Sequence, residues 1–479
     1  MNYSMIIYIL GHLLRYEALF MILPIVTGWI YQEKESYAFV GVALLAYLIG
    51  TIMTRRRPKS AKFYTRDGSV TVALGWIVLS IFGALPFVCC GDIPSYIDAL
   101  FETISGFTTT GASILTDVEA LSHASLMWRS FTHWVGGMGV FVFILSLLPM
   151  LGGFTMQLMK AESPGPSVDK FVPKVKDTAK ILYSLYIVVT LTQIIMLLLT
   201  GMPVFDTLTL TFGTVGTGGF GVKNDSLASY SALQQNIITF FMIVSGINYS
   251  AYFYIISKRF KDAFHMEEVR WYLGIILAAV VIITLNTVPL YSGIAETLRH
   301  AFFQVASIVT TTGFSSTDFN LWPELSKTIL VLLMIIGACA GSTAGGFKVS
   351  RMLILLKSIQ KELSNMIHPR EVKKIRMDGH VIKPEVLQSA HVYLMIYCTF
   401  FLLSVLLISI DNFDFATNFT AVAATFNNIG PGLAGVGPTS NFSCYSTFSK
   451  FVLMIGMLVG RLELYPIMLL LLPATWKRK

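Results

Sequence analysis

The stretch Ser105-Gly-Phe-Thr-Thr-Thr-Gly-Ala112 decides the fold. Its threonines and glycine end a short, half-apolar segment, at a point where a helix stops and the chain turns back. Three related breaks follow: Thr217-Gly-Gly-Phe220, Thr310-Thr-Thr-Gly-Phe314 and Asn427-Asn-Ile-Gly-Pro-Gly-Leu433. The glycines of the four breaks stand 108 (219 − 111), 94 (313 − 219) and 117 (430 − 313) residues apart. This spacing is too long for a solenoid and predicts four internal repeats.

The segments around these breaks are typical of a membrane protein. Of the 479 residues, 54% are hydrophobic and only 13% are charged, against about 25% charged residues in a typical soluble chain. Each apolar run of about 20 residues is long enough to cross a bilayer as a helix. Such runs lie at 70–89, 181–199, 271–290 and 391–410, and a long first run at 5–31 is interpreted as a permanent helix rather than a signal peptide.

Every repeat has the same predicted order: a spanning run, a half-span, a polar break and a second spanning run. The half-spans would reach roughly 20 Å as helices, so they would end inside the ~30 Å hydrocarbon core. They lie at 96–108, 204–215, 296–310 and 413–425, and the second spanning runs are expected at about 127–151, 237–256, from 329 onward, and 451–472.

We therefore predict an all-α integral membrane protein with four pseudo-symmetric helix–pore-loop–helix repeats around a central pore. Two extra N-terminal transmembrane helices, at 5–31 and 37–53, precede the repeats. The predicted units are 1–66 for this helix pair, 67–165, 166–268, 269–385 with a broken second helix, and 386–479.

The four breaks have the chemistry of a cation site. Four half-helices that end near one axis direct the negative ends of their dipoles at a shared cavity. Rings of carbonyl oxygens can replace the hydration shell of a potassium ion, and small threonines add hydroxyl oxygens. The predicted selectivity filter consists of Thr109, Thr110, Gly111, Thr217, Gly218, Gly219, Thr311, Thr312, Gly313, Asn428, Ile429 and Gly430. The pore is expected to pass a monovalent cation, and no organic cofactor is expected.

The distribution of charge gives the orientation. The net charge of +8 is concentrated in clusters between apolar runs, for example at 55–57 and 373–376. This is the positive-inside pattern of a bacterial membrane protein and argues against nucleic acid as a partner. Both termini are thus predicted to be cytoplasmic. Acidic residues near the opposite ends, at 92, 98, 102, 117, 206, 318, 411 and 414, would attract cations to a pore mouth, and Glu102 is a candidate for shaping the pore itself.

A second site is predicted below the filter. Six small or polar residues, Gly341, Ser342, Thr343, Ala344, Gly345 and Gly346, interrupt an apolar helix at membrane depth. Irregular backbone is tolerated there only where protein buries it or water reaches it. Either this segment is a gate across the pore or it allows close helix packing. Arg461 lies in the middle of the last span and should face a cavity beneath the filter. Lys348 is interpreted as an interface residue whose ammonium reaches toward water.

Taken together, these motifs resemble the Trk/Ktr/HKT superfamily of potassium transporters, specifically the TrkH/TrkG branch. Besides the four breaks, the matching residues are Trp128-Arg-Ser-Phe-Thr-His-Trp-Val-Gly-Gly-Met-Gly139, the segment 341–346 and Gly460-Arg-Leu-Glu463. The resemblance implies a homodimer in the bacterial inner membrane, with one pore per subunit and a cytoplasmic nucleotide-binding regulatory ring of the TrkA type. It also supports the gate, and it assigns the filter to the carbonyls at 110–111, 218–219, 312–313 and 429–430.

The leading hypothesis is therefore gated potassium uptake. The alternative is a secondary transporter of an organic solute by alternating access, and a membrane-embedded enzyme is a third possibility that no catalytic constellation supports. The sequence leaves open whether transport is proton-coupled, sodium-coupled (symport) or channel-like.

Overall fold

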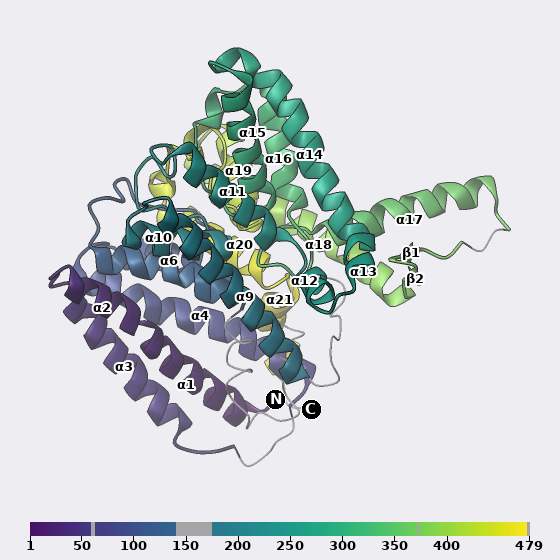
Figure 1. The fold of residues 1–479 in the computed structure, drawn as a ribbon. Coiled ribbons are helices and arrows are strands. Elements are labelled where there is room, and N and C mark those ends of the chain that lie inside the picture. The colour runs from purple at the N-terminus through teal and green to yellow at the C-terminus, as the bar shows by residue number, and fades with distance from the viewer. Residues whose placement is uncertain (59–62, 140–174, 371–372, 477–479) are drawn as a thin grey trace.

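The computed structural model of the chain describes residues 1–58, 63–139, 175–370 and 373–476. In these residues the fold is helical apart from one two-stranded hairpin, and six helices are long and apolar enough to span a membrane, or seven if one bent pair is a single span. The predicted fold class is confirmed. The N-terminal and C-terminal ends of the described chain lie side by side (Figure 1), where the Tyr3 hydroxyl donates to the Trp476 carbonyl at 3.3 Å. Both ends are consequently on the same side of the molecule.

The N-terminal helix pair consists of α1 (Tyr3–Phe20), α2 (Ile22–Ile30) and α3 (Ser36–Thr54), with α1 and α2 forming one continuous span. The pair packs on the first repeat through α1, α3 and α4 and occupies one flank of the molecule (Figure 1). Glycines let α1 and α3 approach closely, because a Cβ on Gly11 would lie 2.9 Å from the Gly50 carbonyl oxygen. The two extra helices are confirmed.

The first and second repeats follow the predicted order. The first contains α4 (Thr65–Cys90), α5 (Tyr96–Phe107) and α6 (His123–Gly137), after which the expected return to residue 151 lies outside the described residues. The second contains α9 (Val175–Leu199), α10 (Val204–Val215), α11 (Ala232–Gly246), α12 (Tyr249–Ile256) and α13 (Phe260–His265).

The third and fourth repeats carry the same pattern with longer connections. The third contains α14 (Glu267–Thr287), the 3-10 turn η2 (Val288–Leu290), α15 (Ile294–Val309), η3 (Phe319–Leu321), α16 (Glu324–Ile336), α17 (Val349–Ile367) and the strands β1 (Arg376–Met377) and β2 (His380–Val381). The fourth contains α18 (Pro384–Ile408), η4 (Ser409–Asp411), α19 (Phe415–Phe426), η5 (Ala434–Val436), η6 (Phe442–Cys444), α20 (Thr447–Arg461), α21 (Tyr465–Leu471) and α22 (Pro473–Trp476). The predicted unit boundaries near residues 66, 268 and 385 fall in the first turns of α4, α14 and α18, and they remain predictions.

The half-spans are the short helices α5, α10, α15 and α19, of 12, 12, 16 and 12 residues. Twelve residues extend for only about 18 Å, which is too short to cross the hydrocarbon core. Side-chain caps fix two of their starts: Ser95 accepts a bond from Asp98 N, and Asp414 accepts one from Thr417 N.

Two of the second spans are broken where the sequence predicted continuous helices. The second span of repeat two bends by 92° between α11 and α12, because Ile247 is extended and the Asn248 side chain caps the new helix at Ser250 N. The last span breaks between α20 and α21, where Glu463 (φ 57°) and Leu464 (φ 66°) are left-handed. Largely apolar composition continues across the first break, so hydropathy does not reveal it; at the second, Arg461 and Glu463 interrupt the apolar run, but charge alone does not show that the helix ends there.

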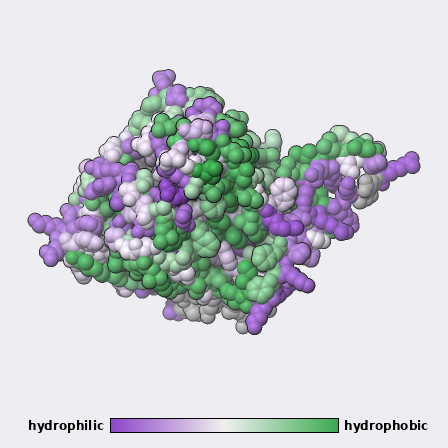
Figure 2. Space-filling model, turned by 45° about the horizontal axis from the view of Figure 1, so that its top comes forward, coloured by the Kyte–Doolittle hydropathy of each residue, from purple (hydrophilic) through white to green (hydrophobic). Residues whose placement is uncertain are grey.

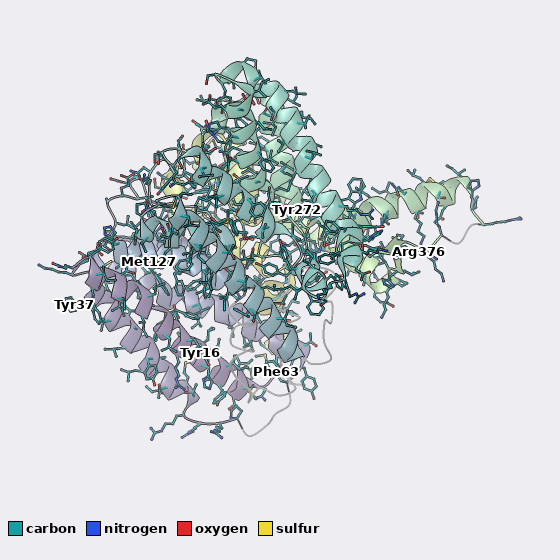
Figure 3. All side chains as sticks on the ribbon, in the orientation of Figure 1. Tyr16, Tyr37, Phe63, Met127, Tyr272 and Arg376 are labelled. Carbon is teal, nitrogen blue, oxygen red and sulfur yellow. The ribbon has the colours of Figure 1, made fainter. Side chains whose placement is uncertain are left out.

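The core extends through all four repeats, and side chains fill the spaces between the helices (Figure 3). Tyr272, labelled there on α14, is fully buried and donates to the Ile243 carbonyl of α11 at 3.2 Å. Figure 2 shows broad hydrophobic areas on the viewed face, with hydrophilic residues on its upper left part and at the projecting ends. This distribution is expected for a protein whose sides contact lipid.

Candidate ion pathway

The four predicted breaks adopt one shared backbone conformation. Two residues before each glycine the chain is left-handed, with φ of 55° to 56°, at Thr109, Thr217, Thr311 and Asn428. The following N–H then bonds back to a carbonyl five residues earlier, at 2.8 to 2.9 Å, in Thr110–Ser105, Gly218–Gly213, Thr312–Ser307 and Ile429–Ala424. Each half-helix therefore ends in the same tight turn, although the residues differ. Non-glycine residues are uncommon in this conformation.

The four turns meet in a closed ring. A Cβ on Gly111 would overlap the Gly218 carbonyl oxygen, one on Gly219 would overlap Thr312 O, and one on Gly313 would overlap Ile429 O. A Cβ on Gly430 would lie 2.9 Å from Thr110 O, which closes the ring. All four glycines have φ between 76° and 98°. Both the conformation and the close approach therefore require glycine.

The ring opens on one side into a single hollow. A cavity of about 190 Å³ is lined by Gly111, Gly219, Gly313 and Gly430 together with the loop residues that follow them. The structure thus places residues separated by more than 300 positions around one space.

The second loop differs from the others in having Gly218 where they carry Thr110, Thr312 and Ile429. The cause is His133 of α6, whose ring occupies the space that a side chain at 218 would need. This ring is fully buried and stacks on Phe220, with centroids 4.3 Å apart. The residues predicted from the sequence did not include His133, although it lies in the motif 128–139.

The fourth loop is held by amides instead of threonine hydroxyls. The Asn428 Nδ2 donates to the Thr110 hydroxyl and to the Met457 carbonyl, both at 2.9 Å. Tyr397 donates to the Asn427 Oδ1 at 3.0 Å. These bonds connect the fourth loop to the first loop and to α20, which explains how Asn replaces Thr there.

The segment 341–346 lies on the opposite side of the ring from the hollow. Gly345 N donates to the Thr311 hydroxyl at 2.7 Å, and a Cβ on Gly345 would lie 2.6 Å from the Asn427 carbonyl. These contacts involve residues that precede the ring glycines, whereas the hollow is lined by residues that follow them. The predicted intramembrane loop is therefore packed directly against the back of the third and fourth turns.

One buried carboxylate holds both ends of this loop. Glu268 Oε1 accepts from Ala340 N at 2.6 Å and from Ser350 N at 3.1 Å, and Asn248 donates to Oε2 at 3.5 Å. The two unpredicted features, the bend at Asn248 and the acid at the start of α14, thus support the loop. No pattern in the sequence indicates this role.

The interpretation of Lys348 as an interface residue is wrong. Its side chain is buried, and its ammonium donates to the Ala344 carbonyl within the loop. The chain turns there (φ 82°) before α17 begins, so the ammonium points back into the protein and not toward the membrane surface.

Arg461 lies at the end of α20, beneath the ring. Its guanidinium donates to Thr343 O at 2.8 Å, to Gly136 O at 2.6 Å and to Gly137 O at 2.7 Å. It therefore joins the loop 341–346 to the end of α6. A nearby ion pair between Arg351 and Glu463 links α17 to the break that follows Arg461.

The prediction that acidic residues gather at a pore mouth is not supported by the lining of the hollow. No carboxylate is among the described residues that line the hollow. Several of the acids instead anchor helix ends: Asp92 accepts from the Ser122 hydroxyl at 2.7 Å, and Asp411 accepts from Ser446 N at 2.8 Å. Asp414 likewise caps the start of α19, where it accepts from Thr417 N at 3.1 Å. Glu102 does not itself line the hollow, because it forms a buried ion pair with Arg129, which does.

Comparison with known proteins gives the family. The family model described as "TrkH: Cation transport protein" matches residues 36–477. This chain belongs to the TrkH family. The TrkH family relatives include the Trk system potassium uptake protein TrkH of Salmonella typhimurium, 36% identical over 100% of both chains, and TrkG of Escherichia coli, 31% identical over 98% and 97%. A crystal structure of the potassium transporter TrkH from Vibrio parahaemolyticus matches with a TM-score of 0.88 and 31% identity, covering 100% of both chains. Membership of this family, together with the spanning helices, makes this a multi-pass membrane protein.

Proposed function

We propose that this protein takes up potassium ions through a pore whose filter is the ring of four loops. The observation that carries the proposal is the closed contact ring of Gly111, Gly219, Gly313 and Gly430 around one hollow. Two relatives named as potassium uptake proteins match over 100% and 98% of the chain. In the proposed filter, the carbonyls of Thr110, Gly218, Thr312 and Ile429 replace water around the ion.

The proposed gate is the loop 341–346 with Arg461. The loop contacts the side of the ring opposite the hollow through Gly345 and Thr311. Arg461 places a fixed positive charge there, and its bond to the Thr343 carbonyl holds the loop in place. A cation leaving the ring meets both obstacles. Opening requires that Arg461 release Thr343, so that the loop moves aside.

The proposed assembly is a homodimer in the bacterial inner membrane with both termini in the cytoplasm. The common location of Tyr3 and Trp476 agrees with both termini on one side. The helix α17 projects from the molecule (Figure 1) and exposes Ile359, Leu363 and Met366. A second copy covers this apolar face, and a TrkA-type regulatory ring binds on the cytoplasmic side.

Potassium-limited growth of a host that lacks its own uptake systems tests the function. Expression of the chain should restore growth at low potassium and drive the entry of radioactive rubidium. Amino acids and sugars serve as control solutes for the alternative of an organic-solute transporter. Restored growth with no rubidium entry, or entry of a labelled organic solute instead, contradicts the proposal.

A further inference from the structure

A buried ion pair lies behind the first two loops of the ring. Glu102 is in the second turn of α5 and Arg129 is in α6, and they are only 1% and 2% exposed. Arg129 Nε donates to Glu102 Oε1 at 2.8 Å. Among the described residues, this is the one ion pair in which both side chains are fully buried. Such a pair is costly to desolvate, so hydrophobic packing would serve stability as well.

The pair touches both loops just after their ring glycines. Glu102 accepts from the Ser113 hydroxyl at 3.0 Å and from Ile114 N at 3.0 Å, which fixes the first loop. Arg129 donates to the Gly221 carbonyl at 3.2 Å, and its guanidinium lies 4.0 Å from the Phe220 ring centroid, which fixes the second loop. Ser113 and Gly221 each follow their ring glycine by two positions. The pair therefore sets the separation of these loops.

At the other junctions the loops themselves are joined by neutral hydrogen bonds, while a partly exposed ion pair of Lys450 with Asp98, at 2.7 Å, joins the helices α20 and α5 of the fourth and first repeats. Leu227 N donates to Ser315 O at 2.9 Å between the second and third loops. The Ala434 N donates to Asn320 Oδ1 at 3.0 Å between the third and fourth, and Phe442 N donates to Ser113 O at 2.8 Å between the fourth and first. Neutral hydrogen bonds are weaker than charge-assisted ones, and only at the first junction, among the described residues, does a fully buried ion pair bond directly to both loops.

Arg129 also lines the hollow next to Gly111 and Gly219. A positive charge at that point repels an entering cation unless it is neutralised. Glu102 neutralises it at 2.8 Å. The pair therefore combines a firm crosslink with zero net charge beside the cation path.

We propose that Glu102 and Arg129 are positioning residues that set the selectivity of the pore for potassium over sodium. They hold the first and second loops at a separation that fits the larger ion, so that the oxygens do not close around sodium. The inference rests on the proposed filter and adds a residue pair that touches no ion itself. Such supporting contacts fix the ligands of an ion, and disturbing them typically lowers affinity or activity tenfold or more.

The test compares rubidium and sodium flux through the purified, reconstituted chain. Glu102→Gln is the sharpest variant, because the half-helix α15 of the third repeat already carries Gln304 at the matching position, nine residues before its ring glycine (111 − 9 = 102; 313 − 9 = 304). We expect the ratio of rubidium to sodium flux to fall about tenfold. Arg129→Lys keeps the ion pair but loses the fork that reaches Gly221 and Ser113, so its ratio should be intermediate.

A purely structural role gives a different result. If the variants only reduce the amount of folded protein, the rubidium and sodium fluxes fall together and their ratio stays unchanged. That result would overturn the proposal. The double variant Glu102→Gln/Arg129→Gln leaves no unpaired charge buried, so it should fold even if the single variants do not. Its ratio of rubidium to sodium flux should still fall. Gly313→Ala serves as the reference for the proposed filter. If Gly313→Ala also leaves the ratio of rubidium to sodium flux unchanged, the proposed filter fails. If the ratio changes in Gly313→Ala but not in the variants of Glu102 and Arg129, only the role of the pair is contradicted.

Discussion

At the scale of single residues, the proposed pathway depends on glycines whose conformation and close contacts leave no room for a side chain. Gly313 combines a φ of 87° with direct contact on the Ile429 carbonyl. A side chain there costs about 1 kcal/mol for the backbone conformation alone and also displaces the neighbouring loop. The threonine-rich motif made this position visible in the sequence, because glycine after three threonines marks a turn.

Gly313→Ala should therefore reduce rubidium uptake at least about tenfold, since the fourth loop must move away from the ring. Gly274→Ala is the matched control, because a Cβ there meets no atom within 4 Å, and its uptake should equal that of the parent. Uptake by cells with equal amounts of protein in the membrane is the measurement. Equal uptake by both variants would contradict the ring.

Arg461 supplies the second prediction at this scale. Removing one positive charge beneath the ring lowers the barrier to a cation by about 1 kcal/mol or more, which is roughly fivefold in flux. Arg461→Ala should thus raise rubidium flux in reconstituted protein without any partner, and Arg461→Lys should stay near the parent level. Flux and selectivity that do not change in Arg461→Ala would remove this residue from the gate.

At the scale of elements, the half-helices were predictable and the broken spans were not. A helix of 12 residues followed by threonine and glycine is visible in composition. The bend at Asn248 lies in a largely apolar run, and the charges at Arg461 and Glu463 do not by themselves show that a helix ends there. Local hydrogen bonds and left-handed residues produce these breaks. Arg129 was detectable in principle, because a charged residue inside a predicted span indicates a function.

The loop 341–346 yields a prediction at the scale of elements. Glu268→Ala leaves the buried donors of Asn248, Ala340 and Ser350 without their acceptor, at a cost of about 1–3 kcal/mol each. The midpoint of thermal unfolding should fall, and flux without a partner should rise because the loop is no longer fixed at both ends. Glu385→Ala, on the exposed first turn of α18, should change neither quantity. A lower midpoint with unchanged flux would mean that the loop does not obstruct the pore.

At the scale of the whole molecule, four-fold repetition was evident from the spacing of the glycines, but the way the repeats interlock was not. Lys348 illustrates the limit: a lysine after an apolar run is typical of an interface, yet here the chain turns and buries it against Ala344. Contacts between distant segments, such as Arg461 with Gly136, depend on the assembled fold and leave no local pattern.

The assembly gives the prediction at this scale. Met366 of α17 is 73% exposed and Ile52 of α3 is 72% exposed. If a second copy covers α17, Met366→Cys in native membranes should form a species of twice the mass with a bismaleimide crosslinker, above the level given by the parent cysteines. Ile52→Cys, equally exposed on the opposite flank, should not exceed that level. Equal crosslinking of the two variants would contradict a dimer through α17.

Crystallography with rubidium, located by its anomalous scattering, tests the central claim most directly. The account predicts a peak on the axis of the ring, at similar distances from the carbonyl oxygens of Thr110, Gly218, Thr312 and Ile429. Bound rubidium elsewhere in the protein, with none between these four carbonyls, would contradict it.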